Sequence, residues 1–219
     1  MREYFKLSYK SNPREFKIKQ DIFRQIRGYK TIFKYLREGV IIFDILEEIS
    51  KDKEKTSEVY RIDVFEVLCK FFSDCHQILL SFCDGNVENQ KIMAENMNLL
   101  MENRHINFNQ IDLLRRVCQK DPNMNTLNDR NQAVYTAKSI LISQMTNPLL
   151  DFLFDLVLYH GKIPEIIEFF IDLVKANEQN SLFFRRSLLK KLFSSTYIEE
   201  LRVSPKFMPD MLLFCKGRE

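Results

Sequence analysis

One long apolar stripe that ends at a glycine constrains the fold of this chain more than any other feature. Along residues 65–82, apolar side chains recur at alternating steps of three and four, the spacing of one face of an α-helix: Phe65, Leu68, Phe72, Cys75, Leu79 and Phe82. Gly85 follows where a helix C-terminus needs a left-handed residue, a conformation that glycine adopts without strain. Asn86 is placed to cap the next helix, with Asn89 and Gln90 in its first turn. The stretch predicts a helix–turn–helix corner.

The composition favours an all-α fold. The 219 residues include 5 Gly and 6 Pro, too few for the tight turns of a β-barrel, and 45% of them are hydrophobic, enough for a substantial core. Helices of varied length, short connections and wide apolar stripes favour an armadillo-like helical solenoid of roughly nine to eleven helices over a compact bundle. We expect residues 1–15 to be a basic N-terminal lead segment and residues 16–219 to form a single domain.

In the N-terminal third, glycines predict the ends of helices. A helix is expected over residues 16–27, with one apolar face made of Ile18, Ile22, Phe23 and Ile26. Gly28 is expected to interrupt it, and Glu38-Gly39 is expected to be a second break before an apolar segment at 40–49.

Beyond residue 50, caps and periodicity predict the remaining helices. A long helix is expected over 57–83, Asn107 or Asn109 is expected to cap the helix near 111, and Asn147-Pro148 is a typical helix start. The Val134, Ala137, Leu141 and Met145 series restores helical spacing. Further helices are expected over residues 164–174, 183–193, 197–203 and 207–214.

Cysteine usage and the absence of targeting signals predict a cytoplasmic protein. The five cysteines are odd in number and lack C-x-x-C spacing, which indicates free thiols in a reducing compartment: Cys69, Cys75, Cys83, Cys118 and Cys215. Residues 1–7 have no apolar segment of the kind found in signal peptides. No apolar run approaches the ~20 residues of a membrane span.

No catalytic or metal-binding constellation is visible, so we predict no enzyme activity, no catalytic residue, no metal and no cofactor. The three histidines are isolated from one another and from cysteines at ligand spacing: His76, His105 and His160. Signatures of acyl hydrolysis, P-loops and dinucleotide binding are absent. Asp151 and Asp155, one turn apart on the most apolar helix, are expected to form a solvated stripe rather than an acid–base pair.

The N-terminal third is basic. Residues 1–37 hold 11 Lys and Arg against 3 Asp and Glu, whereas the whole chain has a net charge of only +3, which argues against a nucleic-acid binder. Eight cations could form an anion-binding strip, a solvated face or a contact to an acidic neighbouring domain: Arg14, Lys17, Lys19, Arg24, Arg27, Lys30, Lys34 and Arg37. Arg185-Arg186 and Lys190-Lys191 form a smaller cluster with the same alternatives.

The corner resembles a known family. The run from Leu79 to Gln90, with Cys83, Gly85-Asn86 and Asn89-Gln90, resembles the RIH domain of inositol trisphosphate receptors and ryanodine receptors. Further similarity lies in Phe23 to Leu46, in Tyr159-His160-Gly161-Lys162 with the segment after it, and in Val203 to Phe214.

The resemblance implies an armadillo-like, non-enzymatic domain on the cytosolic face of the endoplasmic reticulum, part of an intracellular calcium-release channel. Such a domain relays ligand state through helix–helix interfaces to other channel domains or subunits. In the family copy that contacts inositol trisphosphate, a basic pair precedes the Asn-Gln pair. Here Val87 and Glu88 stand at those positions, so the resemblance carries over no ligand-binding residue and points to the later, regulatory copy.

Three functional hypotheses therefore stand. The first is a regulatory and signal-transmission domain of a calcium-release channel. The second is a free-standing armadillo-like scaffold that binds a protein partner in its groove. The third is a module that binds an anionic inositol phosphate or lipid through the basic N-terminal face.

Overall fold

The structure is a computed structural model, and it describes residues 12–51, 58–102, 107–119, 129–160, 164–175 and 186–190. These residues are helical apart from short turns and contain no strand, which confirms the all-α prediction. The chain divides into two compact units. The first unit comprises Met1–Val117 with Asn123–Lys138, and the second comprises Cys118–Pro122 with Ser139–Glu219.

Nine labelled helices lie within the described ranges. They are α1 (Pro13–Gln25), α2 (Gly28–Lys51), α3 (Glu58–Cys83), α4 (Val87–Glu95), α5 (Met97–Met101), α6 (Phe108–Cys118), α7 (Asp129–Gln144), α8 (Thr146–His160) and α9 (Pro164–Lys175). A further short helical segment covers residues 186–190.

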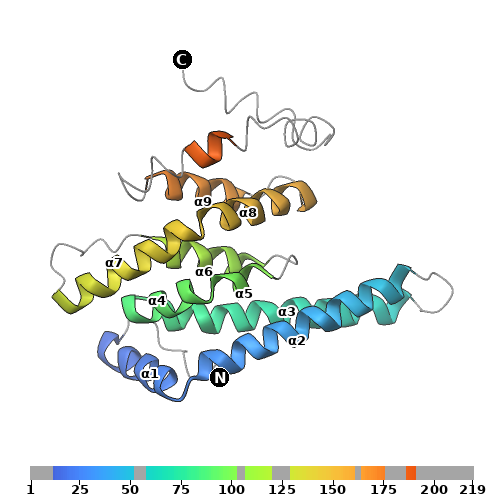
Figure 1. Cartoon of the computed structure of the whole chain (residues 1–219). Helices are drawn as coiled ribbons and strands as arrows, with labels where there is room; N and C mark the ends of the chain where they lie inside the picture. The colour runs from blue at the N-terminus through green and yellow to red at the C-terminus, as the bar shows by residue number, and fades with distance from the viewer. Residues whose placement is uncertain are drawn as a thin grey trace. The chain divides into compact units, whose positions relative to one another are not determined.

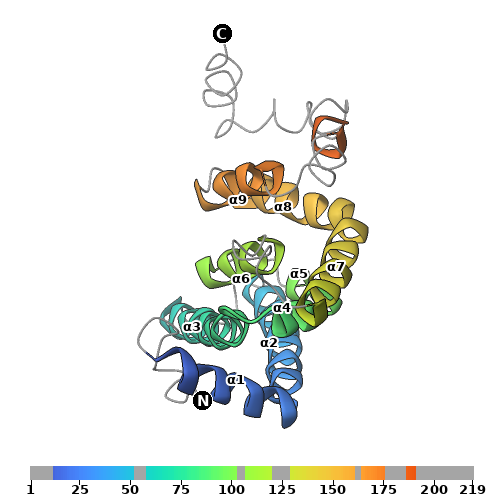
Figure 2. The same cartoon turned by 90° about the vertical axis from the view of Figure 1, so that its left-hand side faces the viewer.

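Helices α2 and α3 form a long antiparallel hairpin that is the centre of the first unit (Figures 1 and 2). The α3 residues Phe72, Cys75, Leu79 and Phe82 are buried, as the stripe predicts, whereas Phe65 and Leu68 are half-buried. From α2, Phe43 packs against Phe65 and Phe72, with ring centroids 4.8 and 6.3 Å apart. The core is therefore built where the apolar faces of the two helices meet.

The predicted break at Glu38-Gly39 is wrong, because α2 runs without interruption from Gly28 to Lys51. A Cβ atom on Gly39 would lie 2.7 Å from Cε1 of Phe72 and 3.4 Å from Cε1 of Phe71. Gly39 is therefore a site of close packing between two helices rather than a helix end.

Helix α1 begins earlier than the periodicity predicts and buries a different face. Asn12 caps it, accepting a hydrogen bond from the Glu15 backbone N–H, and Pro13 occupies the first turn. The boundary predicted between residues 15 and 16 thus falls inside a helix. The predicted apolar face is wrong in three of its four residues, because Phe23 is buried but Ile18, Ile22 and Ile26 are exposed. The buried face of α1 consists of Phe16, Gln20 and Phe23.

The turn between α1 and α2 is centred on Arg27, not on Gly28. Arg27 has a positive φ of 54°, a left-handed conformation that costs an ordinary residue about 1 kcal/mol. Gly28 opens α2, and a Cβ atom there would lie 2.3 Å from the Phe23 ring. Its missing side chain makes room for that ring, whereas the turn itself is made by its neighbour.

Elsewhere in the first unit, Asn107 caps α6 by accepting a hydrogen bond from the Gln110 N–H at 2.9 Å, which confirms one of the two predicted caps. The apolar face of α7 differs from the prediction: Val134 and Ala137 are half-buried, and Tyr135 and Lys138 are the buried residues.

In the second unit, α8 and α9 lie side by side (Figures 1 and 2) and are joined by the Phe154 and Phe170 rings, whose centroids are 5.4 Å apart. Helix α8 begins at Thr146, next to the predicted Asn147-Pro148 start. Asp155 is exposed and Asp151 half-buried, while apolar residues around them are buried. Asp155 therefore fits the predicted solvated stripe, whereas Asp151 is only partly open to solvent.

Several predictions concern residues outside the described ranges: the lead segment up to residue 11, His105, Arg185, Lys191, the helices at 197–203 and 207–214, and Cys215. Within those ranges, no single helix is long and apolar enough to cross a membrane. The bent pair Gln132–Gln144 with Asn147–Val157 meets the length and composition test only jointly.

Candidate functional site

The corner after α3 has the backbone geometry that the sequence predicts. Gly85 has a φ of 63°, and the Asn86 N–H donates to the Cys83 carbonyl at 3.2 Å. The Asn86 side chain then caps α4, accepting a hydrogen bond from the Asn89 N–H at 3.2 Å. The chain therefore reverses within three residues between two capped helix ends.

Amide side chains satisfy the last carbonyls of α3, which have no partner within the helix. Gln20 of α1 donates from Nε2 to the carbonyls of Ser81 and Asp84, at 2.9 and 2.7 Å. Asn89 donates from Nδ2 to the Phe82 carbonyl at 2.8 Å, and Gln90 donates from Nε2 to the Cys83 carbonyl at 3.2 Å. Because Gln20 and Asn89 are fully buried, these bonds replace water that cannot reach the helix end.

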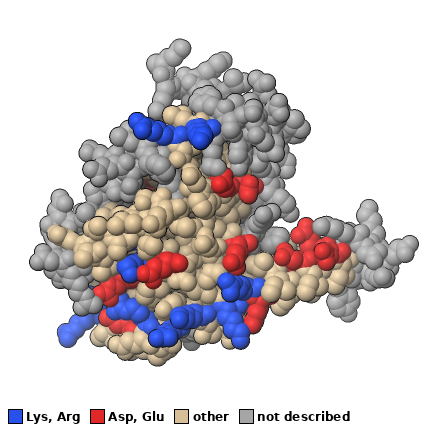
Figure 3. All heavy atoms as spheres, viewed as in Figure 1, with Lys and Arg blue, Asp and Glu red and all other residues tan. Residues whose placement is uncertain are grey.

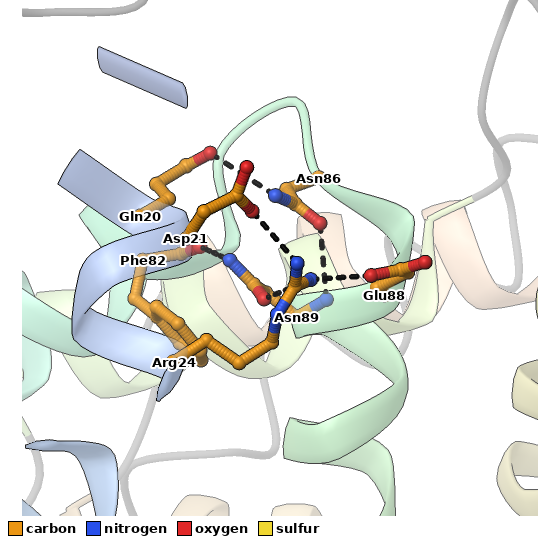
Figure 4. Close-up of polar contacts among 7 residues, drawn as sticks. All are labelled: Gln20, Asp21, Arg24, Phe82, Asn86, Glu88 and Asn89. Atoms are coloured by element: carbon orange, nitrogen blue, oxygen red, sulfur yellow. Dashed lines mark hydrogen bonds and ion pairs between the residues drawn. The ribbon is translucent and has the colours of Figure 1, made fainter. Parts of the chain in front are cut away.

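A network of charges joins α1 to the corner (Figure 4). The Arg24 guanidinium contacts Asp21 at 2.7 Å, Glu88 at 2.5 Å and the Asn89 amide oxygen at 3.1 Å. Gln20 Oε1 accepts a hydrogen bond from the Asn86 side chain at 3.3 Å. Two carboxylates surround one guanidinium, so the corner has no surplus positive charge with which to attract an anion.

A buried lysine completes the corner and was not predicted. Lys138 of α7 donates from Nζ to Gln90 Oε1 at 2.8 Å and lies over the Tyr135 ring, 5.1 Å from its centroid. Its side chain is almost fully buried. A lysine three residues after a tyrosine is ordinary in a surface helix, so the sequence carries no signal for this contact, which depends on a glutamine 48 residues away.

Replacing Gly85 by valine is expected to lower the free energy of unfolding by about 1 kcal/mol or more, because a β-branched residue is strained at positive φ. Gly85→Asn is the control, since asparagine tolerates the left-handed region. Thermal unfolding measures both. Equal melting temperatures for Gly85→Val and the wild type would contradict the corner geometry.

Replacing Asn89 by alanine is expected to lower the free energy of unfolding by about 2 kcal/mol. The change leaves the buried Phe82 carbonyl without its Asn89 donor and removes a hydrogen-bond acceptor of Arg24. Asn98 of α5 is exposed, so Asn98→Ala is a matched control with little expected change. Urea denaturation at neutral pH compares the two. A similar midpoint for both variants would mean that the Asn89 bonds are not needed for stability.

The eight cations of the predicted strip lie on α1, on the first half of α2 and in the turn between them (Figure 3). Four are in ion pairs: Lys19 with Glu15, Arg24 with Asp21 and Glu88, Lys34 with Glu38, and Arg37 with Glu102. The other four are exposed and have no ion pair with any residue that the structure describes: Arg14, Lys17, Arg27 and Lys30. The strip is therefore partly neutralised.

His76 is buried inside α3 and touches the cap of α6. Its Nδ1 lies 3.0 Å from Nδ2 of Asn107, while Nε2 has no hydrogen-bond partner among the described residues. Burial lowers the pKa of His76 to about 4, although a hydrogen bond with the Phe72 backbone partly opposes this shift. The ring is therefore neutral near pH 7.

Two of the four cysteines in the described ranges are buried and kept protonated by their surroundings. Cys69, Cys75, Cys83 and Cys118 are free thiols. Burial, with a smaller effect of Asp74, raises the pKa of Cys75 to about 12, and burial raises the pKa of Cys83 despite the charge of Lys138. Both buried groups thus stay protonated. No group of three or more His, Cys, Asp or Glu that could hold a metal occurs within the described ranges.

Exposed apolar side chains follow the α2–α3 hairpin on both helices. We define the apolar flank as Tyr35, Ile42, Ile45 and Ile49 of α2 with Val64, Val67 and Phe71 of α3, all exposed. The Tyr35 and Phe71 rings, with centroids 6.5 Å apart, join the two helices. Ile42, Ile45 and Ile49, like the three α3 residues, follow steps of three and four, the spacing with which helices pack along a seam.

Comparison with protein-family models, with curated proteins and with solved structures found no match for this chain.

Proposed function

We propose that this chain is a non-enzymatic interaction module that binds a partner helix along the apolar flank. The observation that carries the proposal is that α2 has two apolar faces. One face of this helix packs on α3 through Gly39 and Phe43, while Ile45 and its neighbours in the flank remain about half exposed. Helices with two apolar faces are typical of stacked-helix proteins, in which each helix packs between two neighbours.

The polar corner has a structural role in this proposal. Its amides and charges bond to one another and to the α3 carbonyls, so they stabilise the reversal that holds α1, α3 and α4 together. We also propose that these helices stack into an armadillo-like solenoid and that the flank is the surface on which the stack binds a further helix.

The test is a change of charge on the flank. Ile42→Glu with Val67→Glu should lower the apparent size of the native complex in cell extract toward that of the 26.2 kDa chain, since buried carboxylates oppose helix docking. Both residues are exposed, so the melting temperature should stay close to that of the wild type. Ala133→Glu, at an exposed site on α7, is the control and should elute with the wild type. Identical elution of all three proteins would overturn the proposal.

A second candidate is the regulatory RIH-type domain of an intracellular calcium-release channel, on the cytosolic face of the endoplasmic reticulum. The order of the corner residues favours it, from Cys83 through Gly85-Asn86 to Asn89-Gln90. In this version the partner helix belongs to another channel domain or subunit. Deleting the chain from its native reading frame should reduce calcium release from internal stores. Normal calcium release after the deletion, together with partner binding by the flank of the intact chain, would leave only the scaffold function.

A further inference from the structure

The exposed side of α1 carries a row of isoleucines. Ile18, Ile22 and Ile26 follow one another at steps of four residues and are 52%, 44% and 69% exposed, and Arg14 begins the same row one turn earlier. Residues at i and i+4 lie above one another on a helix, so the three isoleucines form one continuous apolar edge with a cation at its start. We call these four residues the α1 row.

The surface around the α1 row is positive. Residues 12–37 contain eight Lys and Arg against two Asp and Glu, and three acidic residues from outside this range pair with three of the cations: Glu38, Glu88 and Glu102. Of the four cations without an ion pair in the described ranges, Arg14 belongs to the row itself, and the other three adjoin its ends: Lys17 near its start, and Arg27 and Lys30 after Ile26. Figure 3 shows many Lys and Arg, with Asp and Glu among them, over the N-terminal helices.

The opposite side of α1 is fixed to the rest of the first unit. Phe16, Gln20 and Phe23 are buried, and Gln20 donates to two carbonyls at the end of α3. The turn after the helix keeps Arg27 at a positive φ, with Ile26 and Arg27 both exposed. The α1 row is thus held outward by contacts on the far side of the same helix.

We infer that the α1 row docks on a bilayer surface that contains anionic phospholipid. Interfacial helices combine an apolar edge, which enters the boundary between headgroups and acyl chains, with Lys and Arg that contact the headgroups. The four cations at the ends of the row supply the charge complementarity. The apolar side chains of the row are all aliphatic, without the aromatic anchors typical of protein hot spots, which favours a lipid surface over an acidic protein. This surface is separate from the apolar flank, so the inference does not depend on the proposed function.

Co-sedimentation of the full chain with phosphatidylcholine vesicles, with and without phosphatidylserine, tests the inference. We expect partitioning to the anionic vesicles to be stronger by about two orders of magnitude or more, and to be lost at high salt. Arg14→Ala with Lys17→Ala should reduce it about 25-fold, since each cation near an anionic surface contributes about fivefold. Ile18→Glu with Ile22→Glu should reduce it at least about tenfold, because the apolar edge can no longer enter the interface.

Two controls separate this site from others. Ile42→Glu, on the apolar flank, and Ile140→Glu, at an exposed site on α7, should leave partitioning unchanged. Circular dichroism verifies that each variant is folded. Equal partitioning to both vesicle types, or no partitioning, would overturn the inference. Full competition by inositol hexakisphosphate, combined with no effect of the isoleucine changes, would indicate a site for free anions and would also overturn the inference. Binding of an acidic peptide to the row, combined with no binding to vesicles, would overturn it as well.

Discussion

Replacing Phe72 by alanine is expected to lower the free energy of unfolding by about 3–5 kcal/mol. The Phe72 ring is fully buried, lies against Phe43 of α2 and fills the space that Gly39 leaves open. Alanine would remove buried apolar area and leave a cavity where two helices meet, and the helices can close that cavity only in part.

Phe108 provides the matched control for Phe72, since it is a phenylalanine at the start of α6 with 65% of its surface exposed. Phe108→Ala should change stability by no more than about 1 kcal/mol. Urea denaturation of the wild type and both variants gives the comparison. Equal losses for the two alanine variants would mean that the α2–α3 contact is not the core of the first unit.

Acidification is expected to destabilise the folded chain by about 3 kcal/mol between pH 7 and pH 4 through His76 alone. Above its ordinary pKa of about 6.5 the imidazole is neutral in both folded and unfolded chains and makes no pH-dependent contribution. As the pH falls below that value the unfolded chain takes up a proton that the folded chain accepts only near pH 4, where burial has placed the pKa of His76. Each pH unit in that window costs about 1.4 kcal/mol.

The His76 effect is measured as the difference between two pH profiles of stability. His76→Gln replaces the imidazole by an amide that does not titrate. Over the same pH range, the free energy of unfolding of the variant should therefore fall by about 3 kcal/mol less than that of the wild type. Carboxylates elsewhere affect both proteins equally and cancel. Parallel profiles for the two proteins would show that His76 is accessible to protons in the folded chain.

The corner could be predicted from the sequence because its determinants are local. A glycine after an apolar stripe, an asparagine next to it and two amides one turn later are close neighbours in the chain, and backbone sterics with capping chemistry fix their geometry. The identity of the donors to the α3 carbonyls was only partly accessible. Asn89 and Gln90 are near in sequence, whereas Gln20 comes from 61 residues away.

Long-range packing explains the predictions that failed. Gly39 was predicted to break a helix, but it makes room for the Phe72 ring of another helix. The interruption predicted at Gly28 is present in the turn just before it, although Gly28 itself makes room for the Phe23 ring. The apolar face of α1 was misassigned because a helix with isoleucines on one side and Phe16 and Phe23 on the other has two apolar sides. Periodicity alone cannot say which side the protein buries. Periodicity also could not predict the burial of Lys138, because its partner Gln90 lies 48 residues away in the sequence.

Site-specific photo-cross-linking in the native cell tests the interaction module most directly. A photoreactive amino acid replaces Val67, which is 66% exposed on the apolar flank, or Asp112, which is exposed on α6 and serves as the control. We predict that irradiation gives a discrete protein adduct from position 67 and none from position 112. Equal adducts from both positions, or none from position 67, would contradict a docking surface on the α2–α3 hairpin.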